Sequence, residues 1–255
     1  MTPHPTLTAL EARSAYEAGA TLTLGKTVAT WWPRGRRRVL VLPGFLAGDA
    51  STLLMRRTLG QLGHEVHRWR LGINLGPTPA LIERLVARIE ELTDDAQPLD
   101  LIGWSLGGIF ALEIAREVPE RVGVVVTLGT PIQASGPKNS HAHLPFSMLE
   151  PFHEPSVRAQ IPSVHRPPIP VPTTSIYSRS DGIVRWQDCL AVPSAGVENV
   201  EVVASHIGMG ANLAALYVVA DRLAAAESGW QPFSPPRWLR SVYPAPRAYR
   251  VAGAA

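Results

Sequence analysis

A serine lies between two glycines in the stretch Gly103-Trp104-Ser105-Leu106-Gly107, which follows an apolar run and leads into residues with helical spacing. A serine on such a strand-to-helix corner is held in a strained conformation that exposes its hydroxyl, and glycine two positions before and after it avoids backbone collisions. The following helix also directs its N-terminus at this point. The pattern therefore predicts that Ser105 is a nucleophile, and the alternative interpretation is a tight structural turn.

A serine hydroxyl reacts only when a base accepts its proton, and the base needs an acid to orient it. In α/β sheets that carry such a serine, the partners follow along the chain in the order serine, acid, histidine, each on a loop after a strand. Asp181 follows a predicted strand at 174–177, and His206 follows another at 200–203. We therefore predict that Asp181 orients His206 and that His206 accepts the proton of Ser105.

The other histidines fit this role less well. They precede either the nucleophile or the acid in the chain: His4, His64, His67, His141, His143, His153 and His165. A His-x-His pair could in principle bind a metal, but no acidic or cysteine partner follows it at ligand spacing. We expect no metal and no cofactor.

Backbone N–H groups should stabilise the negative charge that develops on the substrate oxygen. One should come from Leu106, directly after the nucleophile, and another from the loop after an early strand. In the sequence VLVLPGFLAGD, Gly44 allows the chain to turn close to the site and Phe45 would supply its N–H, with Leu46 as the second choice.

Apolar runs and amphipathic stretches alternate along most of the chain. The predicted strands span 39–42, 65–69, 99–102, 122–128, 174–177 and 200–203, and the predicted helices span 51–62, 78–92, 106–118 and 212–226. Such alternation is typical of a mainly parallel sheet with helices on both faces. The sequence thus predicts an α/β fold.

The composition bounds the organisation of the chain. Its 255 residues are 45% hydrophobic and 18% charged, which suits one globular domain over residues 1–255. We see no secretory leader pattern and no apolar run long enough to span a membrane, and Cys189 is the single cysteine, so we expect a soluble, cytoplasmic protein. The sequence predicts no oligomeric state.

Residues 131–172 interrupt the alternation, with ten prolines among 42 residues. The segment is too long and too apolar for an ordinary connection, so we predict a cap or lid over the end of the sheet rather than a disordered loop. Side chains from it should line an apolar pocket together with residues near the nucleophile. The pocket candidates are Trp104, Leu46, Phe146, Met148, Leu149 and Phe152.

The end of the chain, residues 230–255, is basic and aromatic. It contains four arginines and no acid, whereas the rest of the chain is close to neutral. A nucleic-acid-binding domain would spread basic charge across its folded body, so we expect no nucleic-acid partner. We favour an arm packed on the domain by its aromatic residues. Attachment to an anionic membrane surface is the alternative.

Taken together, these motifs resemble the α/β-hydrolase fold superfamily, specifically its bacterial esterase and lipase-like members. The resemblance extends over about residues 38–226 and is carried by the Pro-Gly-Phe loop at 43–45, GWSLGG at 103–108, LGTP at 128–131, SDGIV at 180–184 and SHIG at 205–208. It implies that the chain cleaves small-molecule carboxylic esters with apolar acyl or alcohol groups through an acyl-enzyme on Ser105.

Two departures from the family pattern bear on the oxyanion geometry and on the type of reaction, respectively. Pro43 stands where lipases usually have histidine before the glycine. The acid and histidine loops are also similar to those of polyhydroxyalkanoate synthases, which have a cysteine where this chain has Ser105. An acyltransferase or thioesterase with the same triad is therefore the alternative, followed by a binding protein on a hydrolase fold.

Overall fold

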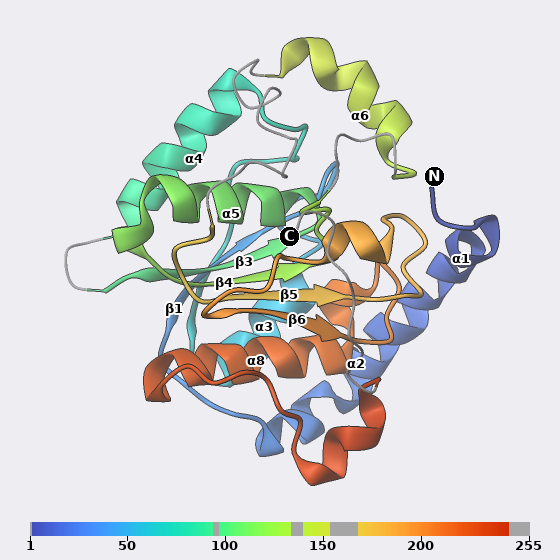
Figure 1. The fold of residues 1–255 in the computed structure, drawn as a ribbon, viewed down its shortest axis with the longest axis vertical. Helices are drawn as coiled ribbons and strands as arrows, with labels where there is room; N and C mark the ends of the chain where they lie inside the picture. The colour runs from blue at the N-terminus through green and yellow to red at the C-terminus, as the bar shows by residue number, and fades with distance from the viewer. Residues whose placement is uncertain (1, 94–96, 134–139, 154–167, 245–255) are drawn as a thin grey trace.

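The computed structural model describes residues 2–93, 97–133, 140–153 and 168–244. Its centre is a six-stranded sheet in which every neighbouring pair is parallel, in the order β2-β1-β3-β4-β5-β6 (Figure 1). The strands are β1 (Arg38–Leu42), β2 (Glu65–His67), β3 (Leu99–Trp104), β4 (Val122–Leu128), β5 (Thr173–Tyr177) and β6 (Val197–Glu201). The predicted α/β class with a parallel sheet is confirmed.

Helices cover both faces of the sheet (Figure 1). The α-helices are α1 (Pro5–Ala9), α2 (Ser14–Val28), α3 (Leu53–Gln61), α4 (Pro79–Leu92), α5 (Leu106–Glu117), α6 (His143–Leu149) and α8 (Leu213–Ser228). Short 3-10 helices are η1 (Leu10–Arg13), η2 (Ala29–Trp31), η3 (Pro119–Arg121), η5 (Glu150–Phe152), η7 (Trp186–Cys189), η8 (Met209–Ala211) and η9 (Arg237–Val242).

Strand β1 shows how the two cores form. Val39 and Val41 pack with α3 and α8, whereas Leu40 and Leu42 pack with α4 and α5 on the opposite face. Successive side chains of a strand point to opposite faces, so a continuous apolar run is needed where both faces are covered. The carboxyl ends of the strands then share one edge of the sheet, where the site residues are found.

The structure differs from the predicted elements near the N-terminus and at two strands, and the strand predicted at 200–203 is β6, which ends two residues earlier. No helix was predicted before residue 51, yet η1 and two helices, α1 and α2, form there. The predicted strand at 65–69 ends at His67, because the Asp49 carboxylate accepts the backbone N–H groups of Trp69 (2.9 Å) and Arg70 (3.1 Å). These donors are therefore not available to extend the ladder.

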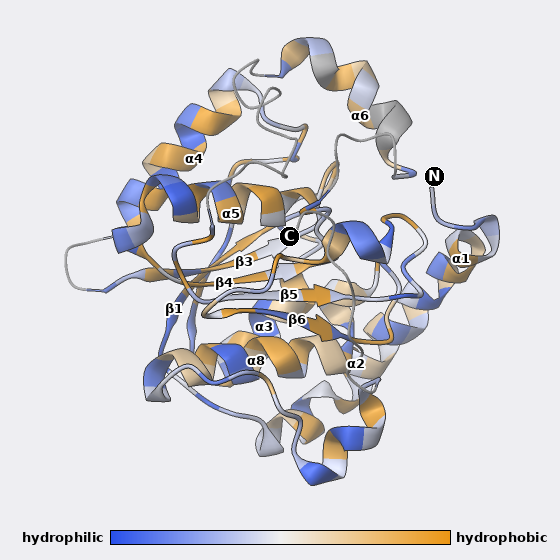
Figure 2. Cartoon of the chain, in the orientation of Figure 1, coloured by the Kyte–Doolittle hydropathy of each residue, from blue (hydrophilic) through white to orange (hydrophobic). Residues whose placement is uncertain are grey.

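Helix α8 lies between the sheet and the C-terminal arm. Figure 2 shows α8 as mainly hydrophobic, whereas hydrophilic and hydrophobic turns alternate along α4. A helix that is apolar on most sides must be covered on most sides. The cover comes from the arm: the Phe233 and Trp238 rings each lie 6.4 Å from that of Tyr217, and the Tyr243 hydroxyl donates to Ala214 O at 3.0 Å.

These contacts agree with an arm packed by its aromatic residues as far as residue 244. The rest of the arm, with Arg247, Tyr249 and Arg250, lies outside the described residues. None of the helices that the structure describes combines the length and apolar character needed to cross a membrane. Contact of the arm with a membrane surface stays a prediction.

Candidate active site

Ser105 occupies the corner between β3 and α5. Its backbone has φ 53° and ψ −120°, outside the regions that residues with a side chain usually adopt. A Cβ at Gly103 would lie within 2.5 Å of Gly107 O, and one at Gly107 would lie 2.6 Å from Pro43 O. The glycines are therefore required by close packing, and Ser105 has the strained conformation that their spacing predicts.

Three hydrogen bonds fix the backbone of Ser105. Its N–H donates to Leu128 O at 2.8 Å, and its carbonyl accepts from Gly108 N and from the Thr130 hydroxyl, both at 3.0 Å. Strain of this kind persists only where the surroundings hold it. The neighbouring strand β4 thus helps to hold the serine at the carboxyl edge of the sheet.

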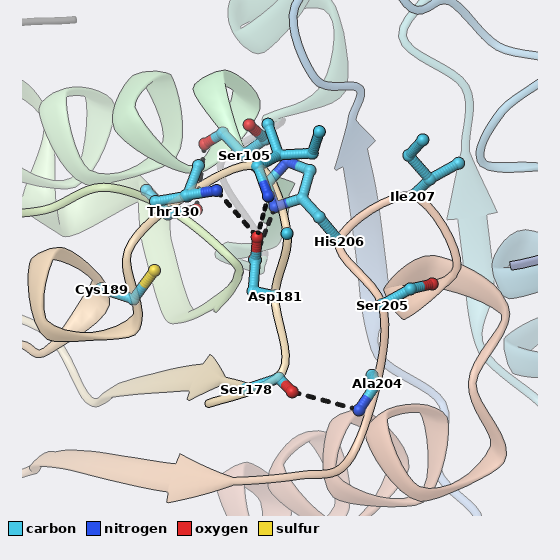
Figure 3. Close-up of polar contacts among 12 residues, drawn as sticks. Ser105, Thr130, Ser178, Asp181, Cys189, Ala204, Ser205, His206 and Ile207 are labelled. Carbon is cyan, nitrogen blue, oxygen red and sulfur yellow. Dashed lines mark hydrogen bonds and ion pairs between the residues drawn. The ribbon is translucent and has the colours of Figure 1, made fainter. Parts of the chain in front are cut away.

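The predicted acid and histidine form a buried pair (Figure 3). Asp181 Oδ2 lies 2.7 Å from His206 Nδ1, and Oδ1 accepts the N–H groups of Ile183 (2.8 Å) and Val184 (2.7 Å). The turn thereby fixes Oδ1, and Oδ2 is directed at the imidazole ring. With its proton on Nδ1, the imidazole keeps Nε2 as an acceptor.

The histidine loop also contacts the residue next to the nucleophile. Trp104 Nε1 donates to His206 O at 3.1 Å. Figure 3 shows Ser105, His206 and Asp181 in one group, with the His206 ring between the other two. The structure thus brings together the three residues that were predicted from the ends of three different strands.

Burial and charge act in opposite directions on His206. Burial lowers the pKa of its imidazole, while the charge and hydrogen bond of Asp181 and the charge of Glu11 raise it. The net result is a pKa above the ordinary value of 6.5. The folded environment therefore favours the imidazolium that a general base becomes after it accepts a proton.

This raised pKa predicts the pH dependence of ester turnover. The base must be neutral to accept a proton, so kcat/KM should fall with decreasing pH through a midpoint above 6.5. The measurement is kcat/KM for an activated ester from pH 5 to 9. An acid limb at or below 6.5 would show that His206 is not the base or that its surroundings differ.

The two backbone N–H groups predicted to bind the oxyanion belong to Leu106, at the start of α5, and to Phe45, in the loop after β1. Leu106 is the first residue of α5, so its N–H has no partner within the helix. For the N–H of Phe45, no acceptor is found among the described residues. The second choice, Leu46, is wrong as a donor: its N–H donates to Asn74 O at 2.8 Å, with φ 57° at Leu46.

Asn74, for which the sequence predicts no role, holds this loop in place. Its side chain is fully buried, donates to Pro43 O at 2.9 Å and accepts from Gly76 N at 3.1 Å. Its backbone N–H donates to Ala47 O at 2.9 Å. The signal in the sequence was an amide residue among the glycines at 72–76, since such residues hydrogen-bond backbone groups in turns.

Replacing Asn74 with alanine should loosen the loop at 43–47, which we predict to bind the oxyanion and call the oxyanion loop. The change leaves buried backbone groups without partners, at about 1 to 3 kcal/mol, and we expect about a 10- to 100-fold loss of kcat/KM. Asn199→Ala is the matched control. The side chain of Asn199, on β6, accepts from Ala191 N (2.7 Å) and donates to Ala191 O (2.8 Å), and Ala191 lies in a loop that carries no site residue. Equal activity losses in the two variants would contradict a specific role for Asn74.

The residues predicted to line the pocket differ in burial and in their distance from the oxyanion loop. Trp104 is 8% exposed and packs in a core cluster, with its indole N–H bonded to His206 O, and its pocket role stays a prediction. The Phe146 ring lies 5.3 Å from that of Phe45, beside the oxyanion loop, whereas Met148 and Phe152 are 70% and 67% exposed. Leu46 is half-exposed at the same loop. Pocket roles for Leu46, Phe146, Met148, Leu149 and Phe152 stay predictions.

Similarity to solved structures identifies the architecture. Lipase B of Aspergillus fumigatus matches with a TM-score of 0.58 and 17% identity, over 74% of this chain and 53% of that one. An alpha/beta superfamily hydrolase from Oenococcus oeni matches with a TM-score of 0.51 and 16% identity, over 74% and 91%. The chain has the α/β-hydrolase fold. A metagenomic carboxyl esterase of this fold also matches, with a TM-score of 0.52 and 14% identity, over 76% of both chains.

Two sequence matches cover parts of the chain. Residues 74–142 match the family described as Thioesterase domain, a stretch that includes β3, Ser105 and α5. The pimeloyl-[acyl-carrier protein] methyl ester esterase of Aromatoleum aromaticum is 41% identical over 63 residues, 24% of this chain. The match likewise spans 24% of that relative's own length.

Proposed function

We propose that this chain is a serine hydrolase that cleaves carboxylic esters through an acyl-enzyme on Ser105. The observation that carries the proposal is the strained Ser105 corner together with the buried Asp181–His206 pair at the same edge of the sheet. Esterases and lipases among the similar structures favour the same chemistry, and so does the methyl ester esterase that matches in sequence.

Each of these groups has one role in the proposed acylation. Ser105 Oγ attacks the acyl carbonyl carbon while its proton passes to His206 Nε2, and Asp181 holds the resulting imidazolium. The N–H groups of Phe45 and Leu106 receive the negative oxygen of the tetrahedral intermediate. The intermediate then expels the alcohol, which takes the proton from His206, and the acyl group stays on Ser105.

Water completes the cycle by the same steps in reverse order. It loses a proton to His206 Nε2 and attacks the acyl carbonyl, and the returning proton releases Ser105 and the free acid. Apolar groups border the proposed site: Phe146 lies against Phe45, and Leu46 exposes half of its surface. These surroundings favour esters with apolar acyl or alcohol groups.

A thioesterase is the second candidate, because the Thioesterase domain match covers the segment that contains Ser105. Both activities share the acyl-enzyme and differ in the leaving group. An acyltransferase would share it too and differ in the acceptor, where an alcohol replaces water. We favour hydrolysis, since water at about 55 M needs no binding site and a bound acceptor would need one.

Matched substrates distinguish these candidates. An oxygen ester and a thioester with the same acyl chain are compared by kcat/KM, and the oxygen ester is then given with millimolar primary alcohol while the products are separated. We expect the oxygen ester to be preferred and free acid to be the main product. A preference for the thioester would make the chain a thioesterase, and new ester as the main product would make it an acyltransferase.

A further inference from the structure

The N-terminal helices cross the carboxyl ends of β5 and β6, where the acid and histidine loops begin (Figure 1). Contacts across more than 160 residues of sequence join the two regions. The Thr8 hydroxyl donates to Gly182 O at 2.9 Å, and Arg13 Nη2 donates to Ser180 O at 2.8 Å and to Ser180 Oγ at 2.7 Å. The segment is thus packed directly on the loop that carries Asp181.

Glu11, in η1, joins the two catalytic loops to one another. Its Oε1 accepts Gly182 N at 2.7 Å and His206 N at 2.9 Å, and its Oε2 accepts Ile207 N at 2.8 Å. Glu11 is only 5% exposed, and no Arg, Lys or His side chain pairs with it among the described residues. All three partners are donors, which is the arrangement that suits an ionised carboxylate.

Glu17, on α2, makes similar contacts one residue away from the histidine. It is 8% exposed, its Oε1 accepts Ser205 N at 2.9 Å and Asn212 Nδ2 at 3.1 Å, and its Oε2 accepts from the Ser205 hydroxyl. Glu17 therefore also holds the histidine loop. However, its hydrogen bonds come from Ser205 and Asn212, and none of them reaches the Asp181 loop.

We propose that Glu11 is a positioning residue of the reaction: its carboxylate fixes the Asp181 loop against the His206 loop, and its charge stabilises the imidazolium. The proposal rests on the proposed function, because it assigns Glu11 a part in the same proton transfer. A buried negative charge bonded to the backbone of the histidine acts on the ring without touching it.

The charged groups around His206 support the proposal that the Glu11 charge stabilises the imidazolium. Asp181 faces the ring from the β5 loop, and Glu11 faces its backbone from η1; both raise the pKa of His206 against the effect of burial. Arg13 and Glu17 are one step further away and bind Ser180 and Ser205, respectively. Removing the Glu11 charge should therefore lower the pKa of His206, and removing the Glu17 charge should not.

The experiment follows the titration of the His206 ring by NMR in histidine-labelled protein. Its signal among the eight histidines is assigned by its loss in His206→Ala. In Glu11→Gln we expect the midpoint to move down by about half to one pH unit, and in Glu17→Gln we expect it to stay in place. An unchanged midpoint in Glu11→Gln, or equal shifts in both variants, would overturn the proposal.

Ester kinetics add a second readout. In Glu11→Gln the acid limb of kcat/KM should move to lower pH while the plateau above it falls about tenfold, since the imidazolium is less stabilised and the loops are less well fixed. A purely structural role would lower the plateau without moving the limb. Because the NMR titration needs no substrate, it tests Glu11 even if the chain hydrolyses no ester.

Glu11→Asp covers the case in which Glu11→Gln does not fold. The shorter side chain keeps the charge but withdraws it from the histidine loop, so a smaller downward shift of the His206 midpoint is expected. If that variant titrates like the unchanged protein, the proposal is wrong.

Discussion

Ser105→Ala, His206→Ala and Asp181→Asn should each lower kcat for an activated ester by about 10⁴- to 10⁶-fold while the fold stays intact. In the proposed mechanism, Ser105 supplies the attacking oxygen, His206 removes its proton, and Asp181 keeps the proton of the imidazole on Nδ1. The measurement is steady-state turnover together with thermal unfolding of each variant. Asp181→Asn should lose the least, because a neutral histidine still remains beside the serine.

The proposed triad would act as a unit, so the losses should not add. We expect Ser105→Ala/His206→Ala to be little worse than the worse single variant. Ser51→Ala removes an exposed hydroxyl that donates to Gly48 O at 2.8 Å and serves as the control for a serine substitution. A His206→Ala variant that keeps most of the activity would mean that the base is a different residue.

Gly107→Ala should destabilise the protein by about 3 kcal/mol or more, among the largest effects expected of a single methyl group. The new Cβ would lie 2.6 Å from Pro43 O and would collide with Leu42 O. Both carbonyls belong to the backbone at the end of a buried central strand, so neither can move without disturbing the sheet. Urea unfolding monitored by circular dichroism measures the change.

Gly60→Ala is the matched control, with the opposite expected sign. Gly60 lies within α3, and nothing lies within 4 Å of the position that its Cβ would take. Alanine in a helix is favoured over glycine by about 1 kcal/mol, so this variant should be slightly more stable. If Gly107→Ala unfolds at the same urea concentration as the unchanged protein, the packing described for the corner is wrong.

The predictable parts of the fold are those that depend on residues close together in the sequence. A buried parallel strand needs a continuous apolar run, as in β1 and β4, and the corner at Ser105 needs glycines at fixed positions. The order of nucleophile, acid and histidine then placed Asp181 and His206 on neighbouring loops. Each of these inferences used residues adjacent in the chain or a rule about strand ends.

The parts that were missed depend on contacts between distant residues. Glu11 and Glu17 carry no local mark of burial, because their partners Gly182, Ser205 and His206 lie over 170 residues away. Helix α2 was missed because its apolar residues form no clear stripe: Leu22 and Leu24 are exposed, while Glu17 is buried. Polar packing of this kind is visible only once the chain has folded.

The most direct test of the acyl-enzyme proposal is covalent labelling with a fluorophosphonate, which reacts with an activated serine. Intact mass and fragment mapping show how many groups are attached and to which residue. We expect one adduct, on Ser105, that forms much more slowly in His206→Ala and is absent from Ser105→Ala. An adduct that persists in Ser105→Ala, or a folded protein that forms none, would contradict it.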